Sequence, residues 1–595
     1  MRKTKIIATL GPASFNQKTI SGLINNGMDV ARINMSHHNE NIGLDKYIAF
    51  IREQAEKYSR TVAILFDLCG PKIRVGKLKN GTIKISKGSH YTLGGTNCDI
   101  PLNINLSFTS HSSGGDVKVN DGNLSFDIVE VEDNTLKLLA HNSGEISSGK
   151  GVNFPGVKLD LPSLTKKDKI DLKLAVELGA DWLAMSFVRS ANDYSIINKE
   201  LERLNASIPV IAKIEKPEAI DNLGAIIDSF DGILVARGDL GVEMPLKELP
   251  ILQKKIVNEC LQKRKPVIIA TQMLDTMIHS PNPTRAEVND IANAIYDGAD
   301  AMMLSGETTV GEYAAESVRM MAEIATTVDK DLDTQNFNRY IYQESWRLQD
   351  FRGSICHAAM ILSNDLSINN IVIMTETGLT AMKMARYRPK AKIFALCTTE
   401  KVCSQLSLIW GVTPVLVEPY STTEEMIQST GSLLKELGFV DKGDLFISIH
   451  INSNESRRPY GFETYLLRPG RNQEAINVAL RENSVIELEG TEFKELTDEQ
   501  LIQATIAQSG FVQYSEKFAA LVQEEIGKRV QSKNLGVKQA GFYVLMGASM
   551  PNVLIELGFI SNPNEEKKLN SSRYRDMLAT SIYYAILRYQ KILND

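Results

Sequence analysis

The sequence predicts an α/β fold whose central part is an eight-stranded parallel barrel, a (βα)₈ barrel. Up to about residue 332, eight short apolar runs occur, and most are followed by a stretch of helical periodicity. The series is interrupted only once, by about eighty residues of a different pattern. A doubly wound open sheet is the competing fold, but it gives no reason for eight such units in series.

The barrel is expected to comprise residues 1–74 and 157–332. Helical stretches are expected after the first strand at Lys18–Asn26, after the second at Ile42–Tyr58, and before the fourth at Lys167–Gly179. The eight expected strands are Ile6–Leu10, Val30–Met35, Thr61–Leu68, Trp182–Val188, Val210–Glu215, Ile233–Ala236, Pro266–Thr271 and Ala301–Ser305.

The interruption, residues 75–156, carries short alternating runs such as TIKIS, DVKVN and FDIVEVE. Pairs such as NG, GG and SG separate these runs, which is typical of hairpin turns. We therefore expect a small antiparallel β-barrel. Because it leaves and rejoins the large barrel at strand ends, it can act as a lid over a site there.

Bulk composition limits the class of protein. The chain has 595 residues, 43% hydrophobic and 23% charged, which is typical of a soluble globular protein with several domains. A net charge of −6 argues against nucleic acid as the main partner, and no apolar stretch is long enough to span a membrane. Six cysteines without CxxC spacing and an N-terminal apolar run too short for a signal peptide favour a cytoplasmic location.

The stretch from Val210 to Gly241 reads as strand, helix, strand and carries the expected site. Lys213 and Glu215 share one strand face by alternation, and Asp239 follows the next strand after Gly238. Ligands of parallel barrels lie beyond the carboxyl ends of the strands, so these groups should meet there. Two carboxylates suit Mg²⁺, and an ammonium suits a phosphoryl oxygen or a developing oxyanion. A purely structural ion pair is the alternative.

Other polar residues are expected at the same rim. Cations, carboxylates and hydroxyls together favour an anionic, phosphorylated substrate bound with Mg²⁺. Each residue alone is also compatible with an ordinary loop-capping or surface role. They are Arg32, Asn34 and Ser36 on one strand face, then Asp67, Lys72, Arg74, Thr271, Ser305 and Glu307.

Long strings of residues 1–332 resemble the pyruvate kinase family, including IIATLGPAS, ARINMSH, GVNFPGV, AKIEKPEAI, ARGDLG and ATQMLDTM. The resemblance implies a cytoplasmic glycolytic enzyme that transfers the phosphoryl group of phosphoenolpyruvate to ADP. An enolate forms and is then protonated to pyruvate. It also implies Mg²⁺ as cofactor and a homo-oligomer, a tetramer in most relatives.

The resemblance also assigns roles to single residues. Glu215 and Asp239 resemble the Mg²⁺ ligands, and Lys213 resembles the cation beside the transferring phosphoryl group and the enolate oxygen. The substrate contacts are Arg32 with the phosphate and the backbone around Gly238 with Thr271. Arg74 and Lys150 resemble nucleotide contacts, and Ser305 and Glu307 resemble groups that relay the proton.

One departure from the family concerns the monovalent cation. Many relatives bind K⁺ at positions matching Asn34, Ser36, Asp67 and Leu68, with threonine at the last and glutamate at the position of Lys72. An ammonium at Lys72 can replace the charge of K⁺, so we expect activity without K⁺. The alternative is that Lys72 is solvated and K⁺ still binds.

The third section, residues 350–449, again alternates strands and helices and resembles the pyruvate kinase C-terminal domain, with its last part missing. Its strands are expected near Ile371–Thr375, Lys392–Cys397, Pro414–Glu418 and Asp444–Ile449. The loop TETGLTA, around Thr375–Thr380, resembles a sugar-phosphate effector loop. We slightly favour a helix N-cap by Thr375 or Thr377, because the rest of the effector pocket is not recognisable.

From about Asp444 to the end the chain resembles zinc-dependent N-acetylmuramoyl-L-alanine amidases, through SIHIN, GFETYLL and VLIELGFISNPNEE. The resemblance makes His450 a zinc ligand and Glu556 the catalytic glutamate. The first half of that domain is absent, and a single histidine cannot fix catalytic zinc. We therefore expect residues 450–595 to be a truncated, inactive amidase-like domain without zinc. The alternatives are a cell-wall amidase fusion and a non-catalytic hybrid.

Overall fold

The computed structural model divides into two compact units, which are described separately. The first contains residues 1–341, 373–388 and 392–416, and the second contains the remainder. The structure describes residues 2–37, 43–104, 106, 108, 115–132, 134–157, 159, 161–332, 356, 359–361, 363, 364, 368–418, 446–452, 458–467, 512–540 and 551–594.

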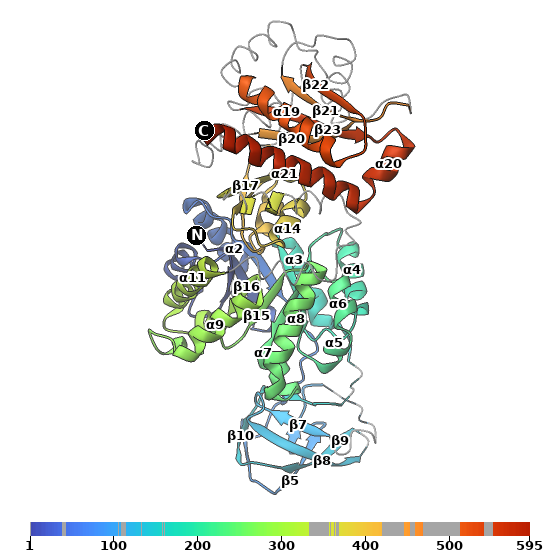
Figure 1. Ribbon diagram of the computed structural model, residues 1–595. Coiled ribbons are helices and arrows are strands. Elements are labelled where there is room, and N and C mark those ends of the chain that lie inside the picture. The colour runs from blue at the N-terminus through green and yellow to red at the C-terminus, as the bar shows by residue number, and fades with distance from the viewer. Residues whose placement is uncertain are drawn as a thin grey trace. The chain divides into compact units, whose positions relative to one another are not determined.

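The first unit contains a closed eight-stranded parallel barrel, which confirms the predicted fold class (Figure 1). All eight expected runs form its strands, most of them slightly shorter than predicted. Around the barrel the strand order is β1-β16-β15-β14-β13-β12-β3-β2. The bounds are β1 Lys5–Leu10, β2 Val30–Asn34, β3 Ala63–Asp67, β12 Trp182–Met185, β13 Val210–Ile214, β14 Gly232–Ala236, β15 Val267–Ala270 and β16 Ala301–Leu304.

Helices follow the strands and bury apolar faces against them in one continuous core. Two of these helices begin with a capping box, Thr165 with Asp168 for α3 and Thr284 with Glu287 for α9. The helices are α1 Gln17–Asn26, α2 Leu44–Lys57, α3 Lys166–Glu177, α4 Asn192–Arg203, α5 Pro217–Asp221, α6 Leu223–Ser229, α7 Arg237–Glu243, α8 Leu249–Lys263, α9 Arg285–Asp297, α10 Gly306–Thr309 and α11 Ala314–Asp331.

The inserted segment forms a six-stranded sheet, ordered β11-β7-β8-β9-β5-β6, and a two-stranded sheet of β10 and β4 around one apolar core. Its alternating runs bury every second residue, as in β9, because strand side chains point to opposite faces. The strands are β4 Thr82–Ile85, β5 His90–Gly94, β6 Ile100–Pro101, β7 Asp116–Val119, β8 Leu124–Glu132, β9 Thr135–Ala140, β10 Gly144–Ser147 and β11 Val152–Asn153.

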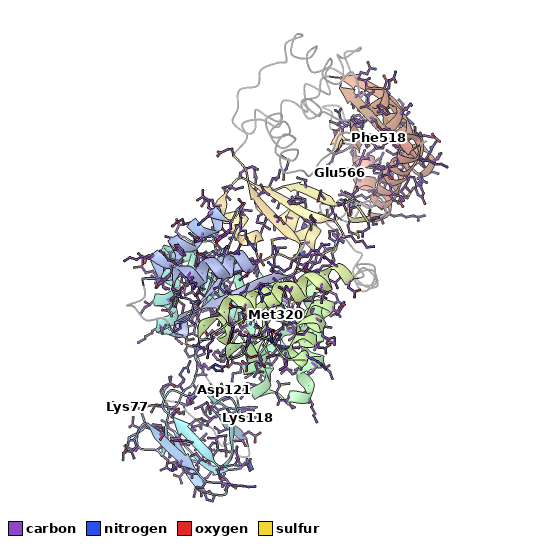
Figure 2. The ribbon with its side chains drawn as sticks, turned by 90° about the vertical axis from the view of Figure 1, so that its left-hand side faces the viewer. Lys77, Lys118, Asp121, Met320, Phe518 and Glu566 are labelled. Carbon is purple, nitrogen blue, oxygen red and sulfur yellow. The ribbon has the colours of Figure 1, made fainter. Side chains whose placement is uncertain are left out.

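The insert is held against the barrel near α7. The ammonium of Lys118, which Figure 2 labels, donates to the carbonyl of Val242 at 2.7 Å. The amide of Asn153 donates to the carboxylate of Glu243 at 2.8 Å, and Lys216 donates to the same oxygen at 2.6 Å. These contacts place the insert next to the helix that carries Asp239.

The third section contributes a three-stranded sheet of β17 Asn370–Met374, β18 Lys392–Cys397 and β19 Val412–Leu416, with α14 Leu379–Ala385 and α15 Glu400–Leu406. Within the first unit it packs on the barrel. The indole of Trp182 donates to the carbonyl of Gln405 at 3.1 Å, and Lys5 donates to the carbonyl of Val412 at 2.7 Å.

The strand expected at Asp444–Ile449 lies elsewhere. It is β20, Phe446–Asn452, and it belongs to a four-stranded sheet of the second unit, ordered β20-β23-β21-β22. Its partner β23, Asn552–Phe559, is fully buried and pairs with β20 on one side and with β21 on the other. The other members are β21 Phe462–Leu467 and β22 Asn534–Ala540, with α19 Val512–Arg529, α20 Pro563–Leu569 and α21 Ser572–Asn594.

This arrangement buries apolar faces of α19 and α21. Phe518, which Figure 2 labels, lies in the tail. It shares one core with Ile582 and Val553, and its ring centre is 5.2 Å from that of Tyr589. The tail therefore completes its sheet with β20. Among the helices that the structure describes, none combines the length and apolarity needed to cross a membrane.

Candidate active site

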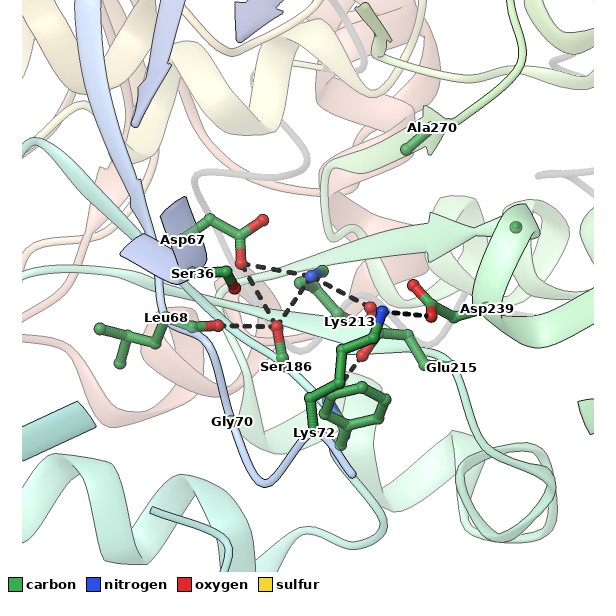
Figure 3. A network of polar contacts seen from close by, with 12 residues as sticks. Ser36, Asp67, Leu68, Gly70, Lys72, Ser186, Lys213, Glu215, Asp239 and Ala270 are labelled. Atoms are coloured by element: carbon green, nitrogen blue, oxygen red, sulfur yellow. Dashed lines mark hydrogen bonds and ion pairs between the residues drawn. The ribbon is translucent and has the colours of Figure 1, made fainter. Parts of the chain in front are cut away.

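The carboxyl ends of β13, β14 and β3 bring four charged side chains together at the mouth of the barrel (Figure 3). The Lys213 ammonium is 3.0 Å from Glu215 Oε1 and 3.2 Å from Asp67 Oδ1. Asp239 follows β14 in the first turn of α7 and lies beside Glu215 in the same network. Lys213, Glu215 and Asp239 thus meet at one barrel mouth, as their strand positions predict.

Lys213 is buried between two carboxylates. Burial alone would lower the pKa of Lys213, but Asp67 and Glu215 outweigh it and raise the pKa above its ordinary value. The side chain of Lys213 also donates to the hydroxyl of Ser186 at 2.8 Å. The site therefore holds a permanent, well-oriented positive charge, which is the property that an anion-stabilising residue needs.

Glu215 and Asp239 are the two carboxylates suited to a divalent cation. Burial raises the pKa of Glu215; Lys213 opposes this shift, and Asp239 adds to it. The two carboxylates thus repel each other, and a dication between them would relieve that repulsion. Hard oxygen donors of this kind fit Mg²⁺.

Two residues with unusual backbone angles support the site. Phe187 has φ of 57°, which is rare for a bulky residue, and its N–H donates to Glu215 Oε2 at 2.7 Å. Thr271 has φ of 75°, and its hydroxyl accepts the N–H of Gly238 at 2.8 Å. Backbone strain of this kind clusters at functional sites. Gly238 and Thr271 are thus in contact, as expected for two parts of one substrate cradle.

Arg32 lies on β2, which is next to β3, and its side chain points to Asp67 at the end of β3. Its Nε and Nη2 atoms donate to Asp67 Oδ2 at 2.8 and 2.6 Å, and its Nη1 atom donates to the Thr9 hydroxyl at 2.9 Å. Burial alone would raise the pKa of Asp67, but Lys213 and Arg32 hold it below its ordinary value. Asp67 therefore carries a negative charge that is balanced by two protein cations.

The positions matching the family's K⁺ site are arranged around Asp67 (Figure 3). Asn34 accepts the N–H of Ser36 at 3.1 Å, and the carbonyl of Leu68 accepts the hydroxyl of Ser186 at 2.7 Å. Lys72 does not lie against Asp67. Its ammonium is 3.0 Å from Asp239 Oδ1 and 5.9 Å from the centre of the Phe187 ring. The expected replacement of K⁺ by Lys72 therefore stays a prediction.

The remaining expected residues fall into two groups. Arg74 and Lys150 are adjacent where the insert rejoins the barrel, because Val75 N–H donates to the carbonyl of Lys150 at 2.8 Å. Glu307 is buried, and its two oxygens accept the N–H groups of Leu274 and Ser305 at 3.0 and 2.7 Å. Burial raises the pKa of Glu307, and these bonds oppose the rise. A proton-relay role for Ser305 and Glu307 stays a prediction.

The effector-like loop and the amidase residues lie outside this site. The hydroxyl of Thr375 accepts the N–H of Gly378 at 2.9 Å, which forms a turn, and α14 has no side-chain N-cap. The N-cap that the sequence favoured is therefore not formed. In the second unit, the register of β20 and β23 pairs His450 with Glu556.

The structure also identifies site residues that the sequence analysis missed. Ser186 contacts Lys213, the Leu68 carbonyl and Asp67, the last at 3.3 Å. Thr9 holds Arg32, and Glu243 joins Lys216 to the insert. Ser186 and Thr9 carry the same signal as Asn34, a polar residue at or near the end of an apolar strand.

A parallel barrel with a lysine, an arginine and paired carboxylates at its mouth defines a class of enzymes that act on phosphorylated substrates with a metal ion. Comparison with known proteins names the family. The pyruvate kinase barrel domain matches residues 1–318, and the pyruvate kinase alpha/beta domain matches residues 353–457. The chain belongs to the pyruvate kinase family, whose members are phosphotransferases.

Individual relatives agree with this assignment. Pyruvate kinases of Staphylococcus aureus strains USA300 and NCTC 8325 are 36% identical over 566 residues, covering 91% of this chain and 94% of theirs. A crystal structure of a pyruvate kinase from Cryptosporidium parvum is similar with a TM-score of 0.70 and 33% identity. The match covers 74% of this chain and 92% of that one.

The tail has a separate match. Residues 430–588 match the N-acetylmuramoyl-L-alanine amidase family, which confirms the resemblance seen in the sequence. This match overlaps the pyruvate kinase alpha/beta domain over residues 430–457, a range that includes β20. The two families therefore meet at the strand that the structure places in the tail's sheet.

Proposed function

We propose that the barrel mouth transfers the phosphoryl group of phosphoenolpyruvate to ADP with the roles that its residues suggest. The observation that carries this proposal is the buried cluster of Lys213, Glu215 and Asp239 at the strand ends. In this reaction the bond from phosphorus to the enol oxygen breaks, and a bond from phosphorus to a β-phosphate oxygen of ADP forms. The remaining enolate takes a proton at its terminal carbon and becomes pyruvate.

Each residue of the cluster has a distinct part in this chemistry. Lys213 lies beside the enol oxygen and stabilises the negative charge that collects there as the phosphoryl group leaves. Glu215 and Asp239 would hold Mg²⁺, which neutralises phosphate charge when bound. Arg32 orients the phosphate, and the Gly238 backbone with Thr271 holds the carboxylate. Arg74 and Lys150 would hold the nucleotide phosphates at the junction with the insert.

We also propose that activity does not require K⁺. Both oxygens of Asp67 already contact protein cations, one of them Arg32 and the other Lys213. The side chain of Leu68 has no oxygen to offer a cation, and Lys72 adds one more positive charge to the network at Asp239. The charge that K⁺ provides in many relatives is thus supplied by side chains.

One assay tests the reaction and the cation requirement together. The full chain is given phosphoenolpyruvate, ADP and Mg²⁺ in buffer without K⁺, and pyruvate is measured with a coupled dehydrogenase. We expect pyruvate to form, and we expect the same rate when K⁺ replaces choline at equal ionic strength. Pyruvate formed only with K⁺ would overturn the K⁺ proposal alone. No pyruvate under either condition would overturn the reaction itself.

For the tail we propose a domain without amidase activity. His450 is the only histidine after His357, whereas catalytic zinc needs three protein ligands. Within the ranges that the structure describes, no three His, Cys, Asp or Glu side chains are grouped to hold a metal ion.

The tail proposal predicts that the full chain, incubated with Zn²⁺ and purified peptidoglycan, releases no peptides above a protein-free blank. Mass spectrometry of the soluble fraction measures the release. A matched variant, Glu556→Gln, identifies any activity that depends on the amidase-like glutamate. Peptide release by the wild-type chain that disappears in Glu556→Gln would show that the tail is an active amidase.

A further inference from the structure

A second pocket of the first unit lies away from the barrel mouth. It lies between the end of α8, the start of β16 and the end of α14. Because α8 leads into β15, the pocket is near the amino ends of the barrel strands, opposite the catalytic end. The residues of the active site therefore do not line it.

Positive charge dominates this pocket. Four cationic side chains line it, Arg264, Lys265, Arg386 and Arg388, whereas Asp300 is its only lining carboxylate. Asp300 is already engaged, because it accepts the N–H of Val267 at 2.9 Å and pairs with Arg388 at 3.1 Å. Three lining cations therefore remain without a balancing carboxylate in the pocket wall, which favours an anionic ligand.

Arg388 is the most buried of the four, with 3% of its surface exposed. Its Nη2 atom donates to the carbonyl of Gly298 at 2.8 Å, and its guanidinium lies 4.4 Å from the ring centre of Trp410. Its Nε and Nη1 atoms are buried and have no acceptor among the described residues. Buried donors of this kind are normally satisfied, so a missing acceptor points to a bound group.

The other three cationic side chains can also contact a ligand. In the described part of the chain, the side chains of Arg264, Lys265 and Arg386 form no hydrogen bond or ion pair with a protein group. Burial and, to a smaller extent, the nearby charge of Arg264 lower the pKa of Arg386 to about 9. Burial lowers the pKa of Lys265, and the charge of Asp231, which lies outside the pocket wall, opposes this shift. A dianion would lower the repulsion between these side chains.

The backbone holds two of these arginines in strained positions. Arg264 has φ of 66° at the C-cap of α8, and Arg388 has φ of 46°. Glycine or asparagine is the ordinary residue at a left-handed helix end. Arginine at both positions is therefore better explained by its charge than by local backbone preference.

We propose that this pocket binds the phosphoryl group of a small phosphorylated metabolite. Arg264, Lys265 and Arg386 contact its oxygens, and Arg388, which pairs with Asp300 through Nη2, donates to the same group through Nε or Nη1. Phosphate is favoured over a carboxylate because several converging cations match a dianion with three free oxygens. The site is independent of the reaction at the barrel mouth, so either proposal can fail without the other.

The test measures anion binding by the full chain with titration calorimetry. Inorganic phosphate is the first probe, and glucose 6-phosphate and adenosine 5′-monophosphate then distinguish sugar from nucleotide sources. We expect Arg264→Gly and Arg386→Gln to weaken binding by roughly tenfold or more, the loss of one charge-assisted hydrogen bond. Arg264→Gly also removes the left-handed strain, so its melting temperature should not fall.

Arg319→Gln is the matched control, because Arg319 is an exposed arginine of α11 that pairs with its helix neighbour Glu323. It should bind phosphate as the wild-type chain does. Binding that is unchanged in both pocket variants would place the anion elsewhere and overturn the proposal. The absence of binding of all three probes to the wild-type chain would also overturn it.

Discussion

Replacing Lys213 with methionine is expected to lower the rate of pyruvate formation by about 10²- to 10³-fold or more, the loss typical of one preorganised electrostatic contact. Methionine has a similar length and fills the buried space, but it carries no charge. The enol oxygen then develops its negative charge without the ammonium that lies between Asp67 and Glu215. The loss should appear in kcat, because this charge develops mainly in the transition state.

The control for this variant is Lys173→Met on α3, whose side chain is 66% exposed and pairs with Glu177. It should keep wild-type activity. Since Lys213→Met leaves Glu215 buried without its cation, a melting curve must show that the variant is still folded. A folded Lys213→Met enzyme with near wild-type kcat would exclude Lys213 from the chemistry.

The barrel was predictable because its signal is repeated eight times along the chain. Each strand is a short apolar run, and errors of one or two residues at its ends do not change the closed order. The position of Lys213 relative to Glu215 followed from strand alternation alone, since residues two apart on a strand share a face. The convergence of these residues with Asp239 followed from the parallel direction of β13 and β14.

Contacts that depend on side-chain conformation were not predictable in the same way. Lys72 follows β3 by five residues, and a flexible four-carbon side chain can reach either Asp67 or Asp239 from there. In the structure it lies against Asp239. The sequence pattern determined neither this choice nor the role of Ser186, whose contacts come from two other strands, β13 and the end of β3.

The place of β20 shows a different limit. The run FISIH is compatible with either of two sheets, because both offer apolar strands of similar length. In the structure β20 pairs with β23, which is about one hundred residues further along the chain. Long-range pairing of this kind is not encoded in local periodicity.

The second large effect is expected from Glu215→Gln. Glutamine keeps the shape of the side chain and can still accept the N–H of Phe187, so the loop after β12 should stay in place. It removes one of the two negative charges available to Mg²⁺. Loss of a residue that only hydrogen-bonds a metal ligand typically costs about 10- to 100-fold in metal affinity. Loss of a charged ligand itself should cost at least as much.

The measurement is the Mg²⁺ concentration that gives half-maximal pyruvate formation, determined for the wild-type chain, for Glu215→Gln and for Glu177→Gln. Glu177 is 59% exposed at the end of α3, so its variant should behave as wild type. If Glu215 holds the metal together with Asp239, excess Mg²⁺ restores part of the lost activity in Glu215→Gln. An unchanged Mg²⁺ requirement in that variant would mean that Glu215 serves only as the buried partner of Lys213, and that the metal is held by other groups.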